Sequence, residues 1–356
     1  MKKLKYIDFA EKLEKDIKEN YNSGDLYLSI SALKEKYNIS LDTINKALSI
    51  LERKDLILRI HGRGTFVGML TQNKEFNILI INDYDIKVVL KQNYTKEEIE
   101  GVYEYITAKN IKISFNTSDN VLANPNIIDQ YDGFLFMSIQ ENITNLARLI
   151  KKANKKIVSV THSIVSDNVY NVDTDISQGM EQIFGYLKQM GHKKVGLIMN
   201  ISNSDHYHDK LRAYGYINVS KKYDIETKEE WIVDEDSDYV EKKTLSKIKA
   251  LSKDDGPTAY IISSFEYSKS LFIDEFLRIR HPQVKRLSII GFDIPVAMYF
   301  YSERPTFIKQ NFKQLGKKGI EALINVLNNE PVERLQIVPH ELITGTTVLD
   351  IFKGAK

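Results

Sequence analysis

The sequence predicts a multidomain chain, with a small winged helix-turn-helix unit (α+β) followed by a larger two-lobed α/β domain. Three observations support this fold class. Two helix-like stretches, a short apolar run and a glycine-rich hairpin follow one another between Ser29 and Gly68. From Phe76 onward, apolar runs of strand length alternate with helical patterns. The 356 residues, of which 42% are apolar, are enough for two or three domains with cores of their own.

The first 70 residues are predicted to form a three-helix unit with a β wing. Residues 6–21 have apolar side chains at helical spacing, and Asn22-Ser23-Gly24-Asp25 ends that helix. A second helix covers Ile30 to Tyr37, and the turn Asn38-Ile39-Ser40 leads into a third, Leu41 to Lys54, with Ser40 at its N-cap. The buried stripe of the third helix is predicted to be Ile44, Ala47, Leu48 and Leu51.

The apolar run Leu56–Leu58 and the segment His61–Val67 predict a two-stranded wing with a glycine-rich tip. A helix presented by such a unit fits the major groove of duplex DNA. The glycines let the wing backbone approach a duplex closely, and Arg63 suits a narrow, negative minor groove. Because the formal net charge of the chain is only +2, any surface that binds nucleic acid must be local.

Ser40–Leu48 and Gly62–Val67 together resemble the GntR family of bacterial repressors, over roughly residues 6–68. The resemblance implies that the start of the recognition helix meets bases and phosphates while the wing enters the minor groove. It implies the following residues at the DNA: Ser29, Ser31, Ser40, Leu41, Asp42, Thr43, Asn45, Lys46, His61, Arg63, Gly64 and Thr65.

The chain departs from this family at the positions that usually bear charge. Ser31, Leu41 and Asn45 stand where arginine is common, and Asp42 adds a negative charge. The predicted DNA surface is therefore electrostatically poor, although Thr43, Asn45 and Lys46 can still contact bases or phosphates. The alternative is a winged helix that makes only protein contacts.

Residues 71–75 are predicted to be a linker, and residues 76–356 a two-lobed domain. Lobe 1 is placed at about 76–162 and 294–339, and lobe 2 at about 163–293 and 340–350. Seven apolar runs predict buried parallel strands: Ile78–Ile81, Ile111–Phe115, Gly133–Met137, Ile157–Val160, Val195–Met199, Ala259–Ile262 and Leu287–Phe292. Six helices are predicted: Lys96–Lys109, Ile143–Ala153, Ile176–Met190, Tyr239–Leu251, Tyr267–Ile279 and Phe312–Leu327.

An ordered set of motifs resembles the LacI/GalR sugar-binding regulatory domain: Asn171-Val172-Asp173, Gly191–Gly196, Arg212–Tyr216, Leu287–Asp293 and Thr306–Phe312. The resemblance implies the fold of periplasmic binding proteins, with two α/β lobes and a small-molecule effector in the cleft between them. A GntR-like reader joined to such a domain is similar to the arabinose-responsive repressors of bacteria.

The same resemblance implies that Arg212, Asp293 and Gln310 contact the effector. Planar charged groups bind the paired hydroxyls of a sugar with bidentate hydrogen bonds, which agrees with this assignment. Further positions are weaker candidates for the same cleft: Asp83, Tyr84 and Asp85 at the end of the first strand, and His162, Ser264 and Glu266.

Several of these residues have simpler alternatives. Arg212 could form an ordinary surface ion pair, and Asp293 could cap a turn. His162 could be a structural histidine. Trp231, the only tryptophan, could stack on a sugar, but core packing is the better expectation. His206 and His208 have the spacing of a metal pair, but without a third ligand a solvated loop is expected.

The function expected from these patterns is sequence-specific transcriptional regulation, most simply repression of sugar-utilisation genes by a cytoplasmic homodimer. The partners would be double-stranded operator DNA and a monosaccharide or derivative, with no membrane, metal or cofactor. The chain has no cysteine, secretory signal or apolar span, and no nucleophile-elbow, Walker or zinc-protease motif. The alternatives are a sugar-binding transport protein and, less well supported, an enzyme on an α/β fold.

Overall fold

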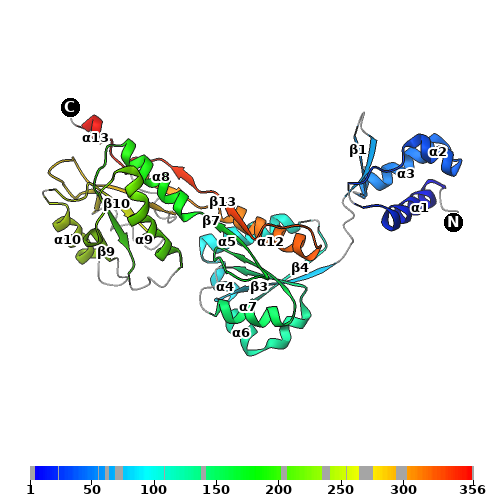
Figure 1. Cartoon of the computed structure of the whole chain (residues 1–356), viewed down its shortest axis with the longest axis horizontal. Coiled ribbons are helices and arrows are strands. Elements are labelled where there is room, and N and C mark those ends of the chain that lie inside the picture. The colour runs from blue at the N-terminus through cyan, green and yellow to red at the C-terminus, as the bar shows by residue number, and fades with distance from the viewer. Residues whose placement is uncertain are drawn as a thin grey trace. The chain divides into compact units, whose positions relative to one another are not determined.

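The computed structural model of the chain contains two compact units, residues 1–75 and 76–356 (Figure 1). Each unit is described by itself. The structure describes residues 5–22, 24–54, 56–60, 64–68, 75–107, 109–137, 142–201, 207–234, 241–253, 255–263, 276–293 and 303–354.

The first unit has the predicted order of three helices and a hairpin. Its elements are α1 (Lys5–Asn20), α2 (Ile30–Tyr37), α3 (Leu41–Arg53), β1 (Ile57–Ile60) and β2 (Gly64–Val67). The two strands pair antiparallel, with Ile57 opposite Val67. The core closes over the predicted stripe of α3, in which Ile44, Ala47, Leu48 and Leu51 are all fully buried. The winged helix-turn-helix is thus confirmed, and it has a core of its own.

The second unit contains two six-stranded sheets, one in each lobe. The lobe 1 sheet has the order β13-β7-β6-β5-β3-β4 and is parallel throughout. Helices α5 and α12 cover one face, and α6 and α7 cover the other (Figure 1). The bounds are β3 (Phe76–Asn82), α4 (Ile86–Val89), α5 (Asn93–Ile106), β4 (Ile111–Thr117), α6 (Ser118–Ala123), η1 (Pro125–Gln130), β5 (Gly133–Met137), α7 (Ile143–Lys152), β6 (Lys156–Val160), β7 (Val169–Thr174), α12 (Phe312–Leu327) and β13 (Leu335–Val338).

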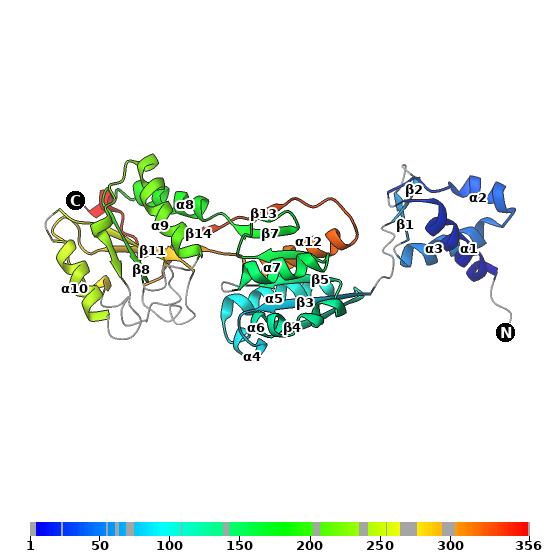
Figure 2. The same cartoon turned by 60° about the horizontal axis from the view of Figure 1, so that its bottom comes forward.

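The lobe 2 sheet has the order β14-β12-β11-β10-β8-β9 and is parallel except for β14. Helices α8 and α9 pack on one face and α10 on the other (Figure 2). The bounds are α8 (Ile176–Gln189), β8 (Val195–Met199), α9 (Tyr207–Val219), η2 (Ser220–Tyr223), η3 (Glu229–Trp231), β9 (Ile232–Asp234), α10 (Glu241–Leu251), β10 (Ala259–Ile262), β11 (Ser288–Phe292), β12 (Thr306–Lys309) and β14 (Glu341–Ile343), with α13 (Ile351–Gly354) near the carboxyl terminus.

The strand pairing corrects two of the predicted lobe limits. Residues 163–174 were assigned to lobe 2, yet β7 pairs with β6 in the lobe 1 sheet. Residues 294–311 were assigned to lobe 1, yet β12 pairs with β11 in lobe 2. The chain therefore crosses between sheets after β7, after β12 and between β13 and β14. Strand partners decide these limits, and a single sequence does not reveal which strands pair.

All seven predicted strands form, but the sequence missed five others: β7, β9, β12, β13 and β14. Of the five, β9, β13 and β14 lie at sheet edges, whereas β7 and β12 lie inside their sheets and directly precede an interlobe crossing. In β13, for example, burial alternates and only Val338 is fully enclosed. Such strands lack the continuous apolar run that predicted the others. The predicted helix Tyr267–Ile279 lies mostly outside the described residues.

Helices α5 and α12 approach each other at glycine. A side chain on Gly316 would collide with the backbone carbonyl of Glu98, and one on Gly101 with that of Lys313. Since neither obstacle is the mobile end of a side chain, the two helices would have to separate. This contact anchors α12, the first helix after the crossing from lobe 2, onto lobe 1.

We predict that Gly316→Ala lowers the free energy of unfolding of the two-lobed unit by about 3 kcal/mol, because overpacking forces the backbone to move. The matched control is Gly185→Ala in α8, whose new methyl meets only the ring of Tyr223 at 3.3 Å. Alanine there gains helix propensity of up to about 1 kcal/mol. Urea unfolding of both variants checks this, and equal stabilities would contradict the close approach of the two helices.

His192 follows α8 in lobe 2 and is almost fully buried, with its Nδ1 2.9 Å from the hydroxyl of Thr258. Burial lowers the pKa of His192 to about 4, although the Leu349 backbone acts in the opposite direction. The folded protein therefore keeps this ring neutral at pH values where the unfolded chain, with a pKa near 6.5, protonates it. Between about pH 6.5 and 4 the unfolded state binds more protons, so stability falls as the pH falls.

We predict that His192→Gln reduces the pH dependence of stability. Between pH 7 and pH 5 the native histidine should cost about 2 kcal/mol, and the variant lacks this loss. The measurement is the difference in unfolding free energy between the two pH values, for the native chain and for the variant. An identical difference in both proteins would show that His192 does not titrate in this way.

Candidate functional site

The start of α3 is fixed by its own side chains. Ser40 caps the helix, accepting a hydrogen bond from the Thr43 amide at 3.3 Å, and its hydroxyl lies 2.8 Å from that of Thr43. Asn38 adopts a left-handed conformation with φ 49°, which lets α2 end and the chain turn. Ser29 caps α2 in the same way. The helix-turn-helix geometry thus comes from local capping, which the sequence predicted at Ser40.

The predicted DNA residues differ in accessibility. Ser29, Ser31, Ser40, Leu41, Asp42, Lys46 and Gly64 are exposed, and Thr43 and Asn45 are half-buried. Lys46 reaches Asp42 one turn earlier, with Nζ 2.8 Å from the carboxylate. The acidic side chain therefore engages the cation at the start of the recognition helix. His61 and Arg63 lie outside the described residues.

The structure corrects the prediction for Thr65. The residue is only 7% exposed, and its carbonyl accepts a hydrogen bond from the Tyr27 amide at 2.7 Å. The segment before α2 packs along β2 and covers this residue, an arrangement that local sequence does not reveal. Gly64 precedes it with φ +112°, a conformation that a residue with a side chain rarely adopts.

In the two-lobed unit, Arg212 on α9 is 5% exposed and projects inward. Its Nη1 donates to the carbonyl of Ser263 at 2.7 Å, and its guanidinium lies over the ring of Phe292 at 4.5 Å. Its Nη2 is 3.6 Å from the carboxylate of Asp293. The remaining donor, Nε, is buried and has no partner among the described residues. Arg212 is thus a buried cation with an unused donor, and not an exposed ion pair.

Asp293 and Gln310 continue this network across the lobes. The Gln310 amide donates to Asp293 at 2.7 Å, and the Thr174 hydroxyl donates to Gln310 at 3.2 Å. Asp293 directly follows β11, with φ +55°. Burial raises the pKa of the Asp293 carboxyl and outweighs the opposing effects of the Arg212 charge and the Gln310 amide. The structure therefore brings all three principal effector candidates together, beside the crossings that follow β7 and β12.

A second polar group lies at the end of lobe 1 and includes residues that the sequence analysis missed. Asp173, 3% exposed, accepts hydrogen bonds from the Ser163 hydroxyl and the Thr174 amide, and it lies 3.6 Å from Nε2 of His208. Burial opposes ionisation of Asp173, yet His208, Ser163 and Thr174 together hold its pKa below the usual value. Asp173 was noted only as part of a family motif, and His208 was expected in a solvated loop but lies on α9.

His162 is half-buried close to this group, and Asp83 also influences it electrostatically. Burial and the neighbouring His208 lower the pKa of His162, so its ring is neutral near pH 7. The preceding Thr161 has φ +62°, which is unusual for a β-branched residue. Thr161 and Asp293 thus place two strained residues at the carboxyl ends of strands, where α/β sheets bind ligands.

His340, at the third crossing, is a further residue that sequence reasoning missed. It is 5% exposed and stacks edge-on against Phe292, with ring centroids 5.9 Å apart. Both ring nitrogens are buried without a hydrogen-bond partner in the described part of the chain. Burial and the Arg212 charge lower the pKa of His340 to about 4, so the ring is neutral. No motif signalled this residue, because only the tertiary fold brings the third crossing beside Arg212.

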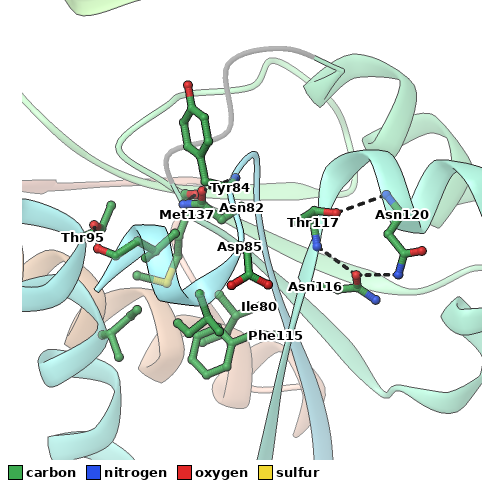
Figure 3. A pocket seen from close by; sticks show the side chains of 13 residues that line it. Ile80, Asn82, Tyr84, Asp85, Thr95, Phe115, Asn116, Thr117, Asn120 and Met137 are labelled. Atoms are coloured by element: carbon green, nitrogen blue, oxygen red, sulfur yellow. Dashed lines mark hydrogen bonds between the residues drawn. The ribbon is translucent and has the colours of Figure 1, made fainter. Parts of the chain in front are cut away.

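Tyr84 and Asp85 line a pocket at the carboxyl ends of β3 and β4 in lobe 1 (Figure 3). Ser264 and Glu266 lie outside the described residues. Trp231 is buried, with Lys228 Nζ 4.7 Å above its ring, which agrees with core packing. Within the described ranges no cluster of acidic and histidine side chains could hold a metal ion. In those ranges no helix is both long and apolar enough to cross a membrane.

Comparison with known families agrees with both units. Residues 5–67 match the family described as bacterial regulatory proteins, gntR family, and residues 184–348 match the periplasmic binding protein-like domain. The chain is 22% identical over 331 residues to an arabinose metabolism transcriptional repressor of Halalkalibacterium halodurans, covering 86% of this chain and 84% of that protein.

Two further relatives are transcriptional repressors of the PurR type. The Photobacterium profundum protein is 25% identical over 274 residues, covering 72% of this chain and 77% of the relative. The Aliivibrio salmonicida protein is 24% identical over 221 residues, covering 61% of this chain and 64% of the relative. The latter match therefore spans slightly less than two thirds of the relative's length.

Solved structures share the fold at low identity. The regulator CcpA of Lactococcus lactis superimposes with a TM-score of 0.59 at 17% identity, covering 77% of this chain and 100% of that chain. The Lac repressor dimer bound to operator and an anti-inducer superimposes with a TM-score of 0.59 at 14% identity, covering 79% of this chain and 96% of that chain. The chain therefore combines an amino-terminal segment that matches the gntR family model with a two-lobed unit that shares the fold of CcpA and the Lac repressor.

Proposed function

We propose that this protein is a DNA-binding transcriptional repressor whose operator affinity is controlled by a small sugar or sugar derivative. The observation that carries the proposal is the buried Arg212–Asp293–Gln310 network at the crossings between lobes, in a chain that begins with a gntR-type reader. Repressors are also the relatives that the chain resembles along most of its length.

The network suits a polyhydroxylated, uncharged ligand. Arg212 offers an unused buried donor, and Asp293 offers a carboxylate that already accepts from Gln310. Vicinal hydroxyls both donate and accept, so they can satisfy such a pair. One charge-assisted hydrogen bond, made in only one lobe arrangement, is worth about 1.5–3 kcal/mol. A tenfold change in DNA affinity requires about 1.4 kcal/mol of coupling.

In this proposal the ligand acts by favouring one arrangement of the lobes over another. Thr174, Gln310 and His340 stand at the three crossings, so binding beside them can bias that arrangement. A homodimer would present two readers to a two-fold symmetric operator, and the lobes would set their separation. Such a regulator acts in the cytoplasm and needs no metal or catalytic residue.

Two other functions have weaker support. A sugar-transport protein has no use for the capped recognition helix at the amino terminus. An enzyme would need an activated nucleophile or an acid–base pair, whereas Arg212 and Asp293 are held by structural partners.

The first test uses a gel shift with the DNA upstream of the chain's own gene, in low salt. We expect the native chain to retain the DNA fragment. A thermal-shift screen of pentoses, hexoses, their acids and their phosphates then identifies a ligand, and the gel shift is repeated in its presence to measure the change in DNA retention. Arg212→Ala should retain operator binding but require at least tenfold more sugar for the same response.

Lys222→Ala is the matched control for Arg212→Ala, because it removes an exposed lobe 2 cation whose partner, Glu181, is also exposed. If Arg212→Ala alone unfolds the protein, Asp293→Asn tests the same network with little change in shape. Absence of DNA retention under all conditions would reject the regulator. Loss of DNA binding together with sugar response, in a folded Arg212→Ala, would contradict the assigned role.

The weak charge of the reader leads to a second prediction. Leu41 is 52% exposed at the first position of α3. Leu41→Arg should strengthen DNA binding several-fold near 0.1 M salt, and one new phosphate contact should steepen the plot of log K against log salt by about 0.9. The control is Leu335→Arg in lobe 1, an equally exposed leucine far along the chain. Equal salt slopes for both variants would show that the start of α3 does not approach phosphate.

A further inference from the structure

The first turns of α3 present a pair of opposite charges to solvent. Asp42 is the second residue of the helix and Lys46 lies four residues later, so both side chains are on one face. Lys46 Nζ is 2.8 Å from Oδ2 of Asp42, and the two side chains are 56% and 74% exposed, respectively. The hydrogen bond to Asp42 raises the pKa of Lys46, so the ammonium group is charged at neutral pH.

The neighbouring polar side chains are engaged by the helix itself. The Ser40 hydroxyl accepts a hydrogen bond from the Thr43 amide and lies 2.8 Å from the Thr43 hydroxyl. Asn45 is half-buried. In a helix-turn-helix unit the first residues of the recognition helix lie against the base edges in the major groove. Asp42 and Lys46 are therefore the charged groups that this helix start offers to a base pair.

The Asp42 carboxylate is unfavourable for DNA binding in general. An exposed ion pair contributes little to the stability of the fold, so stability does not explain it. Near a duplex the carboxylate repels the phosphates and neutralises the lysine that would attract them. Asp42 consequently lowers the affinity for any DNA that does not give its oxygen atoms a hydrogen-bond donor.

A C·G base pair matches both charges at once. In the major groove, cytosine presents its N4 amino group as a donor, and guanine presents O6 and N7 as acceptors. Cytosine N4 and guanine O6 are hydrogen-bonded to each other, so they lie about 2.9 Å apart. The distance between the Asp42 oxygen and the Lys46 nitrogen is 2.8 Å. The carboxylate can therefore face cytosine N4 while the ammonium group faces guanine.

The other base pairs match the two charges less well. Thymine would place its O4 acceptor against the carboxylate, and guanine would place O6 and N7 there. Adenine has an amino group for the carboxylate, but its partner thymine offers the ammonium group one acceptor beside a methyl group. The pair of charges thus discriminates both by attraction to C·G and by repulsion of the alternatives.

We propose that Asp42 and Lys46 together determine specificity by selecting a C·G base pair, with cytosine facing Asp42, in each operator half-site. Asp42 accepts a hydrogen bond from cytosine N4, and Lys46 donates one to guanine. This inference rests on the proposed DNA-binding function and extends it to the sequence of the operator.

The test begins with selection from a randomised DNA library, using the full-length native chain and Asp42→Ala in parallel at low salt. The native selection should fix a C·G pair in each half-site, and the variant selection should leave that pair unconstrained. Gel shifts then compare four operators that differ only at this pair. The native chain should bind the C·G operator at least tenfold more tightly than the other three, and Asp42→Ala should bind all four within twofold.

Lys46→Met distinguishes a base contact from a phosphate contact. If Lys46 contacts guanine, the variant should weaken the C·G operator at least fivefold more than the other three. A phosphate contact would instead weaken all four equally and reduce the slope of log K against log salt by about 0.9, which would overturn the inference. Glu19→Ala is the matched control, because Lys15 and Glu19 form an exposed pair of the same spacing on α1, with nitrogen and oxygen 3.7 Å apart. It should leave the base preferences unchanged.

The outcomes separate this inference from the function on which it rests. Failure of the native chain to enrich any DNA would reject the regulator and the inference together. Enriched DNA without the C·G pair would overturn the inference alone, as would a preference for that pair that persists in a folded Asp42→Ala. If Asp42→Ala does not fold, the selective loss in Lys46→Met decides, and its absence refutes the assignment.

Discussion

The burial of the Arg212 guanidinium constrains the whole two-lobed unit. A charge removed from water destabilises the fold unless it is paired and hydrogen-bonded. Ser263 and Asp293 meet that requirement from the carboxyl ends of two neighbouring strands, and Phe292 provides a ring face. Asp293 accepts a hydrogen bond from Gln310, and Gln310 accepts one from Thr174. The hydrogen bonds that begin at the Arg212 cation therefore reach the two crossings that follow β7 and β12.

In the proposed function, this chain of contacts is the route by which a ligand would influence both lobes. Asp293 belongs to the end of a lobe 2 strand, and Thr174 to the end of a lobe 1 strand. A ligand that competes for the Asp293 carboxylate would alter hydrogen bonds that connect the two. His340 lies against Phe292 at the third crossing and stays neutral, so it adds shape and polarity without adding charge to a site that already holds a cation.

The Arg212 network and the DNA-reading unit differ in what they need from the fold. The Arg212 network depends on residues from distant segments and on the crossings between lobes. The DNA-reading unit shows the opposite case, in which serine caps and a left-handed asparagine build the helix pair locally. Residues 1–75 contain 14 basic and 11 acidic residues, so the net charge of the unit is small. In the proposed function, DNA binding therefore depends on where the individual charged and polar side chains lie more than on the net charge.

The sequence alone determined the reader, the seven buried strands and the residues of the Arg212 network. Helical spacing, N-cap serine and continuous apolar runs are local signals, and the proposed effector residues followed from a family resemblance. Only the tertiary structure decided that β7 belongs to lobe 1 and β12 to lobe 2, because strand pairing joins segments far apart in the chain. The same long-range packing buried Thr65 beneath the segment before α2, moved His208 beside Asp173 and brought His340 to Phe292. Burial and proximity are properties of the folded chain. The hydrophobic periodicity of one segment does not show which other segments will pack against it.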